Sequence, residues 1–471
     1  MSTTDAAPAP AHTGPAVDLT SQLLAEHVVT RAFASADDAG WWHVRRAIVD
    51  TVAVAVAGRS EPAVTKLLAV HGTPALTPWA VPTEANRPDD VARVNGTAGH
   101  ALDFDDAAHD VNGHPSVVLV TAVLAMASDD DTLSAVTEAY AVGHEVWAML
   151  AEALPGDEHY AKGWHATSSM GTVAAAAAVA RLRGLDVERT RMALGTAASM
   201  SAGSRQAFGS MTKPFHAGMA AANGVLAARL GEAGFTSDDH QVEGPFGYLA
   251  LLGADGVARQ PVHPPTGPAL LSRVGVNIKR YPCCYFAHRA IDAAVQLRDE
   301  GLDAADVADV EVVVQPEGLA ALPHTRPSTG LQAKFSMQYC IAAGLTGGVP
   351  TLADFEDAAT GRAELTDLLP RIRPREAATP PVGPAEYPGR FAVVRATTHD
   401  GEVREVRVDT AIGDARRPLS DEDLRVKAAS CLRTGGVGEA DVDVALEHLA
   451  ALDPAMTVDD GLGPVFTASQ G

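Results

Sequence analysis

The chain has 471 residues, of which 46% are hydrophobic and 20% charged, a composition typical of globular proteins rather than disordered or fibrous ones. Its length favours two or three domains, because single hydrophobic cores stop growing at about 250–300 residues. The formal net charge of −23 argues against nucleic acid or an anionic membrane as a partner, since both recruit basic surfaces.

The chain opens with residues 1–17, which are rich in Ala, Pro and Thr and are expected to form a disordered tail. This segment lacks the basic and then apolar pattern of a signal peptide, and no apolar run reaches the roughly 18–20 residues of a membrane span. The four Cys follow no metal-binding or secreted-framework spacing. We therefore expect a cytoplasmic protein with reduced thiols.

Helical periodicity dominates residues 18–268, where Ala, Leu, Val and Met recur at three- and four-residue spacing between short loops. The character changes over residues 269–416. There, VADVEVVVQPEG indicates a strand, and RFAVVRATTHDGEVREVRVDTA indicates two strands joined by a turn at Asp400–Gly401. Helical periodicity returns over 417–462. The predicted fold class is mainly α, with a large helical domain built from both chain ends and an inserted, smaller α+β domain.

Residues 100–116, HALDFDDAAHDVNGHPS, concentrate four Asp and three His just before a core-like helix. Three interpretations compete: a metal site, a prenyl-diphosphate site, or a cofactor-free acid/base site. His109 and His114, with the neighbouring Asp residues, offer ligands for Zn or Mg, but no HExxH, CxxC or EF-hand spacing is present. The first interpretation is therefore disfavoured.

The prenyl-diphosphate interpretation rests on two acidic segments. DDAAHD at 105–110 resembles the first metal motif of class I terpenoid synthases, and DDTLSAVTE at 130–138 approximates the second. The segments are too close in sequence to lie on facing helices across a deep cavity. An aromatic content of 5% also fits poorly with the stabilisation of carbocations.

Three further segments favour acid/base chemistry: GWHATSSMGT at 163–172, RQAFGSMTKPFHAG at 205–218 and NIKRYPCCYFAHRAIDA at 277–293. Each places a His at a loop–helix junction, and two of them add Lys and Arg. A lone His is usually structural, but the repetition indicates a site that handles protons next to carboxylates.

Residues 189–231 and 256–291 contain no Asp or Glu, although the whole chain is acidic. Both stretches hold several Lys and Arg, which predicts a locally positive pocket for an anionic ligand. The alternative is that buried Ala-rich helices simply lack acids. Lys427 lies outside both stretches and is expected to have little influence on such a pocket.

These blocks, in this order and followed by KFSMQYCIAAGL at 334–345, resemble the MmgE/PrpD family, which includes 2-methylcitrate dehydratases, cis-aconitate decarboxylases and iminodisuccinate epimerases. The resemblance covers about residues 19–455. It implies a homodimer, a lid formed by the α+β domain, a polycarboxylate substrate and no cofactor or metal. By resemblance, the expected catalytic residues are Asp103, His114, His165, Lys213 and Tyr339. The expected substrate-binding residues are Arg205, Lys279, Cys284, His288 and Arg289.

Two departures from the decarboxylase branch bear on the reaction. The loop between Asp103 and His114 is one residue longer, and Cys284 stands where decarboxylases carry His. Both favour dehydration of the 2-methylcitrate dehydratase type. Epimerisation, decarboxylation of cis-aconitate and an inactive binding homologue remain alternatives.

Overall fold

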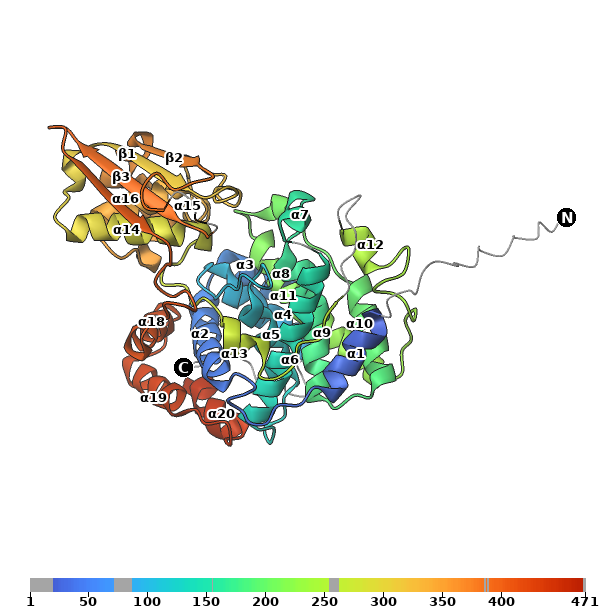
Figure 1. Cartoon of the computed structure of the whole chain (residues 1–471). Helices are drawn as coiled ribbons and strands as arrows, with labels where there is room; N and C mark the ends of the chain where they lie inside the picture. The colour runs from blue at the N-terminus through green and yellow to red at the C-terminus, as the bar shows by residue number, and fades with distance from the viewer. Residues whose placement is uncertain are drawn as a thin grey trace.

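The computed structural model describes residues 20–71, 87–154, 156–253, 262–384, 387 and 389–468. The expected disordered tail, residues 1–17, lies outside the described residues. The protein is mainly α-helical with a small α+β part (Figure 1), which confirms the predicted fold class.

The helical part is built from segments on both sides of the α+β part. Before it come α1 (Thr20–Thr30), α2 (Trp41–Gly58), α3 (Pro62–His71), α4 (Pro88–Ala101), α5 (Pro115–Met126), α6 (Leu133–Ala153), α7 (Gly156–Ala161), α8 (Ala166–Ser169), α9 (Gly171–Leu182), α10 (Val187–Ser199), α11 (Thr212–Glu232), α12 (Tyr248–Leu252) and α13 (Leu270–Val274). After it come α18 (Asp421–Thr434), α19 (Glu439–Ala451) and α20 (Val458–Ala468).

Small residues set the position of α4 in this part. A Cβ atom on Gly96 of α4 would lie 2.8 Å from the Cα of Gly218 in α11, and one on Gly58 of α2 would collide with the backbone carbonyl of Ala98. Glycine at these contacts therefore lets α2 and α11 approach α4 closely from two sides. The carboxyl end of α4 is held firmly, and that end carries the candidate site.

The α+β part contains a four-stranded sheet formed by β1 (Val307–Val314), β2 (Ile372–Glu376), β3 (Ala392–Thr398) and β4 (Val403–Val408), in the order β2-β1-β3-β4. β1 runs parallel to β2 and antiparallel to β3, which pairs antiparallel with β4. Gly401 has φ +90° in the β3–β4 turn, so the predicted hairpin is confirmed. α14 (His288–Asp299) packs on β3 and β4, and α16 (Met337–Gly347) packs on α14 and β2.

Short helices complete the α+β part and its connections. They are α15 (Gly330–Ala333), α17 (Ala363–Thr366) and the 3-10 helices Tyr285–Ala287, Ala304–Asp306, Leu352–Phe355, Asp357–Gly361 and Leu369–Arg371; a further 3-10 helix, Arg205–Ala207, lies between α10 and α11 of the helical part.

Each part has its own hydrophobic core. The larger core takes buried residues from Leu24 to Ile278 and again from Leu419 to Ala468. The smaller core runs from Tyr281 to Val408 and is inserted between those two stretches. The extent of the two cores does not fix the domain boundaries, so the limits expected from the sequence, residues 269 and 416, stay a prediction.

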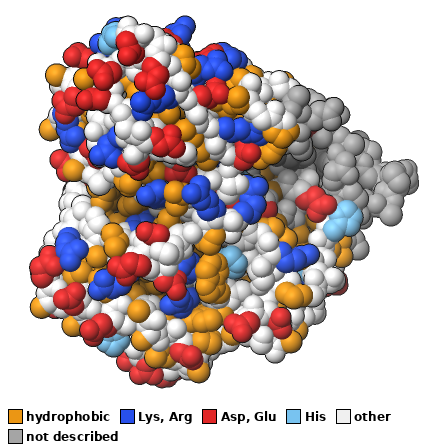
Figure 2. Space-filling view, turned by 60° about the vertical axis from the view of Figure 1, so that its left-hand side comes forward, with side chains coloured by type: hydrophobic (Ala, Val, Ile, Leu, Met, Phe, Trp, Pro, Cys, Tyr) orange, Lys and Arg blue, Asp and Glu red, His pale blue; other side chains and the backbone are white. Residues whose placement is uncertain are grey.

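The surface between the two parts is indented, and Lys and Arg side chains gather there, as Figure 2 shows. Acidic and basic side chains alternate over the rest of that face. None of the helices in the described ranges is long and apolar enough to cross a membrane. All four Cys are buried and free.

Candidate active site

The chain turns sharply where α4 ends. Asp103 has φ +51°, in the left-handed region that side chains rarely adopt, and its N–H donates to the His100 carbonyl at 3.1 Å. A short polar side chain tolerates this conformation better than a bulky one. The turn leaves the Asp103 side chain buried at the entrance to the α4–α5 loop.

Two lysines neutralise the Asp103 carboxylate. Lys213, in the first turn of α11, places its Nζ 2.6 Å from Oδ1, and the Nζ of Lys279 lies 3.3 Å from the same atom. Burial opposes ionisation of Asp103, but the two ammonium groups outweigh it and hold the pKa of that carboxyl well below its usual range. The Oδ2 atom of Asp103 is buried and has no hydrogen-bond partner among the described residues.

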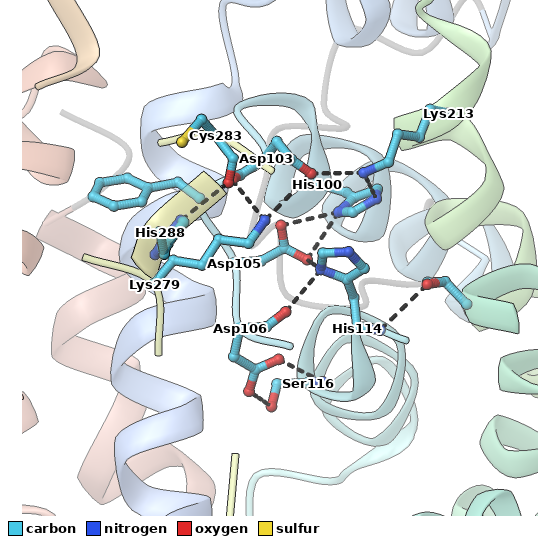
Figure 3. A network of polar contacts seen from close by, with 12 residues as sticks. His100, Asp103, Asp105, Asp106, His114, Ser116, Lys213, Lys279, Cys283 and His288 are labelled. Atoms are coloured by element: carbon cyan, nitrogen blue, oxygen red, sulfur yellow. Dashed lines mark hydrogen bonds and ion pairs between the residues drawn. The ribbon is translucent and has the colours of Figure 1, made fainter. Parts of the chain in front are cut away.

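A second carboxylate joins two imidazoles, and the group of His100, Asp105 and His114 is called the imidazole–carboxylate cluster below (Figure 3). The Nδ1 of His100 lies 2.8–2.9 Å from both carboxylate oxygens of Asp105, and its Nε2 lies 2.8 Å from Lys213 Nζ. Since carboxylates only accept and ammonium groups only donate, His100 is neutral with its proton on Nδ1. Burial and the charge of Lys213 lower the pKa of His100 to about 3, although Asp105 acts in the opposite direction.

His114 immediately precedes α5 and faces the cavity described below. Its Nδ1 lies 2.8 Å from the Asp106 carbonyl and 3.1 Å from Asp105 Oδ2. Both partners accept, so Nδ1 carries the proton and Nε2 is the atom that can exchange a proton with a ligand. Burial lowers the pKa of His114, while Asp105 favours the imidazolium form.

His165 precedes α8 and is completely buried. Its Nδ1 lies 3.2 Å from the Nδ1 of His216, and its Nε2 has no hydrogen-bond partner among the described residues. Burial, followed by the charge of Lys213, holds the pKa of His165 well below its usual value. In the tautomer in which Nδ1 donates to His216, Nε2 presents an unpaired base.

These side chains surround a cavity of about 530 Å³ between the helical and α+β parts, part of it open to solvent. The helical part contributes the polar groups, and the α+β part contributes mainly apolar walls and one guanidinium. The lining includes Asp103, His114, His165, Lys213, Tyr160 and Phe208 from the first part and Cys284, Tyr285, Phe335 and Arg390 from the second. Apolar walls with a few convergent polar groups are the usual form of a small-molecule site.

A separate groove of about 660 Å³ runs between α2, α18 and α19. Its described lining contains no histidine or lysine and no member of the imidazole–carboxylate cluster. The proton-handling groups therefore belong to the cavity at the end of α4.

Of the residues expected from the sequence, Asp103, His114, His165, Lys213 and Cys284 meet in this cavity. Burial raises the pKa of the Cys284 thiol to about 12, so it is neutral at physiological pH. Lys279 is not among the described residues that line the cavity, but its Nζ contacts both the carboxylate and the carbonyl of Asp103.

The other expected residues form hydrogen bonds to backbone carbonyls rather than line the cavity. Arg205 donates to the carbonyls of Tyr160 and Ala320, at 2.6 and 3.0 Å. Arg289 donates to the Asp409 carbonyl at 2.9 Å, and His288 Nε2 lies 3.3 Å from the Cys283 carbonyl. The Tyr339 hydroxyl donates to the Asp354 carbonyl at 2.6 Å. None of the four is among the residues that line the cavity in the described part of the chain.

Some site residues were not predicted from the sequence. His100 and Asp105 lie in the segment singled out there, and their five-residue spacing across a helix end was the available signal. His216 lies in the Lys213 segment. Arg390 reaches the cavity from the loop before β3, with Nη1 2.8 Å from His109 Nδ1, and no local pattern marked it.

The imidazole–carboxylate cluster also has the composition of a metal site. Its nitrogen and oxygen atoms lie within 4.8 Å of one another. However, two ammonium groups, Lys213 and Lys279, belong to the same network, and Lys213 contacts His100 directly. A cation bound there would be repelled at close range. The donor set therefore suits proton transfer better than metal binding.

The acidic segment at 130–138 does not contribute to the cavity. Its first residue, Asp130, is exposed at the start of α6, whereas Asp105 and Asp106 are buried. The two acidic motifs of the terpenoid-synthase interpretation therefore do not face a common cavity.

A mainly α fold, an α+β part and a cavity lined by His, Lys and Asp between them are the features of a candidate enzyme site. The model of the MmgE/PrpD N-terminal domain matches residues 22–260, and that of the C-terminal domain matches residues 281–451. The chain belongs to the MmgE/PrpD family, and it is an enzyme of the lyase class.

Three similar proteins are cis-aconitate decarboxylases. That of Mus musculus is 28% identical over 365 residues, which cover 74% of this chain and 73% of that protein. That of Homo sapiens is 28% identical over 367 residues, 74% of each. That of Aspergillus terreus (strain NIH 2624 / FGSC A1156) is 26% identical over 396 residues, covering 78% of this chain and 80% of the relative.

Proposed function

We propose that the protein is a cofactor-independent lyase for a small di- or tricarboxylic acid, and that it dehydrates a hydroxy acid of the 2-methylcitrate type. One observation carries the proposal. The Nε2 of His165 is an uncharged base with no hydrogen-bond partner among the described residues, and it is buried in a cavity that also holds the ammonium group of Lys213. Such a base is what removal of a proton next to a carboxylate requires.

The other groups fit the remaining steps of a dehydration. Lys213 pairs with the substrate carboxylate and stabilises the enolate-like charge that develops when the adjacent carbon loses its proton. His114, once protonated on Nε2, gives that proton to the departing hydroxyl group, and Asp105 stabilises its imidazolium form. The carbon–oxygen bond breaks, a carbon–carbon double bond forms, and the proton and hydroxyl group leave as water.

Decarboxylation of cis-aconitate is the second candidate, and the names of the relatives favour it. In that reaction carbon dioxide leaves first and an acid returns a proton to the carbon. Cys284 is neutral and too weak an acid to replace a histidine in that role. An uncharged base facing the cavity suits a reaction that begins with proton removal, which is why dehydration is preferred.

The proposal also covers closure of the site, the oligomeric state and the location of the protein. Cys284, Phe335 and Arg390 line the cavity from the α+β part, which supports a lid that closes on the substrate and excludes water. The family resemblance supports a homodimer and a polycarboxylate substrate, and the four free cysteines support a cytoplasmic location.

Proton NMR in heavy water tests the reaction directly. The purified enzyme is incubated separately with 2-methylcitrate, citrate, iminodisuccinate and cis-aconitate. Dehydration is supported by a new vinyl signal, or by deuterium incorporation next to a carboxylate of a hydroxy acid. Release of carbon dioxide from cis-aconitate at an ordinary enzymatic rate would establish the second candidate instead. Inversion of iminodisuccinate without loss of water or carbon dioxide would make the enzyme an epimerase.

A further inference from the structure

Three consecutive backbone carbonyls at the end of α4 each accept a hydrogen bond from a different lysine. Lys334 Nζ lies 2.8 Å from the Leu102 carbonyl, Lys279 Nζ 2.8 Å from the Asp103 carbonyl, and Lys427 Nζ 2.8 Å from the Phe104 carbonyl. This set of lysines is called the lysine cradle.

The cradle gathers residues from distant parts of the chain. Lys279 belongs to the connection into the α+β part, Lys334 lies between α15 and α16, and Lys427 lies in α18. All three are buried. Two of them are linked directly, because Lys427 donates to the Lys279 carbonyl at 2.9 Å, and Lys334 donates to the carbonyl of Pro282, in the same segment as Lys279, at 3.1 Å.

The carbonyls need these donors for two reasons. These carbonyls follow the last residue of α4 and lie outside its ladder of hydrogen bonds, and water cannot easily reach them because the turn is buried. The left-handed conformation of Asp103 is also intrinsically unfavourable, so surrounding contacts must hold it.

The contacts of Lys334 show that the lysines of the cradle do more than neutralise carboxylates. No carboxylate is paired with it in the described ranges, and its hydrogen bonds go to carbonyls. Burial lowers the pKa of Lys334 to about 8, so keeping an ammonium group there is unfavourable. A methionine would fill similar space without that cost, but it would not direct the Leu102 carbonyl.

We infer that Lys279, Lys334 and Lys427 are positioning residues that fix the turn at Asp103, so that its carboxylate stays in contact with Lys213 at the cavity. The inference rests on the proposed function because it takes the Asp103 carboxylate as part of the active site. It changes the expected role of Lys279 from substrate binding to support of the turn. It also assigns a role to Lys334, the first residue of the block at 334–345, and to Lys427; neither is among the described residues that line the cavity.

A double-mutant cycle tests the inference with Lys334→Met and Asp103→Asn, since Asn tolerates the left-handed conformation. We expect Lys334→Met to lower kcat by about 10- to 100-fold with KM changed less than about threefold, because a misplacement of about 1 Å costs on that order. Lys334→Met should have no further effect in the Asp103→Asn background. Lys162→Met is the matched control. Lys162 also donates to backbone carbonyls, those of Leu251 and Gly253, but it is exposed and lies outside the cavity lining.

The cycle separates failure of the inference from failure of the proposed function. Full activity in Asp103→Asn would overturn the role of the carboxylate, and with it the proposed site. If Asp103→Asn lowers kcat but Lys334→Met does not, or if the two effects simply add in the double variant, the positioning role of the cradle is refuted while the proposed site stands. If Lys334→Met does not fold, Lys334→Gln retains a donor of shorter reach, and the same comparison applies to it.

Discussion

Replacing His165 with Gln separates chemistry from stability. Gln keeps a polar side chain of similar size but cannot take up a proton at neutral pH. The substitution lowers stability by the loss of one neutral hydrogen bond, the 3.2 Å contact between the Nδ1 atoms of His165 and His216, which contributes about 1 kcal/mol. The catalytic cost is the loss of a general base, about 10²- to 10⁴-fold in kcat, or roughly 3–5 kcal/mol of transition-state stabilisation.

The assay follows the ultraviolet absorbance of the unsaturated acid and, in parallel, thermal unfolding. We expect turnover to fall at least about 100-fold, while the melting temperature falls by a few degrees at most. His263→Gln is the matched control, because that side chain is 70% exposed and pairs only with Glu152 at 3.0 Å among the described residues. If His165→Gln keeps full activity, the assignment of the base is wrong, whichever reaction the enzyme performs.

Further predictions concern the rest of the site. Lys213→Met should lower kcat/KM by about 100-fold or more and cost about 3 kcal/mol in urea unfolding, because it breaks a buried ion pair; the exposed Lys66→Met should do neither. Burial raises the pKa of Asp106 to about 7 in the folded state, so this carboxyl holds more protons in the folded than in the unfolded protein and its own contribution to stability falls as pH rises from about 4 to 7, opposite in sign to the contribution of buried histidines such as His100. Asp106→Asn removes this dependence, and its stability relative to wild type should rise by up to about 4 kcal/mol over that window; equal slopes for both proteins would contradict the shift. Activity should survive exhaustive chelation, and a stoichiometric metal whose removal abolishes turnover would refute the acid/base interpretation. Cys284→Ala should reduce turnover less than about tenfold, since a neutral thiol shapes the cavity without transferring protons.

Local patterns were sufficient for most of the fold. Periodicity of three to four residues located the helices, and alternation with an Asp400–Gly401 turn located β3 and β4, because both signals arise within a few neighbouring residues. β2, with the sequence IRPRE, was not predicted. It is a short edge strand that contains Pro374, and it exists through parallel pairing with β1 more than fifty residues earlier in the chain.

The site was predictable only where a segment carried its own chemistry. Asp103, His114 and Lys213 stood out because polar groups interrupted apolar helices. Lys427 was expected to have little influence on the pocket because it lies outside the basic stretches, and that expectation stays a prediction. The structure shows that it is buried, with Nζ 2.6 Å from Asp50 Oδ1. Its partners lie hundreds of residues away, and no local pattern reports such a contact. Arg390 was missed for the same reason.

The lysine cradle also determines when the site can form during synthesis. Lys427 binds a carbonyl 323 residues earlier in the chain. At a synthesis rate of about 5–20 residues per second, α18 is made roughly 15–60 s after α4. Until then the carbonyl of Phe104 lacks its buried donor and Asp50 lacks its counter-ion. The helices of the first part can pack while the ribosome is still working, but a nascent chain has no complete active site until α18 has emerged.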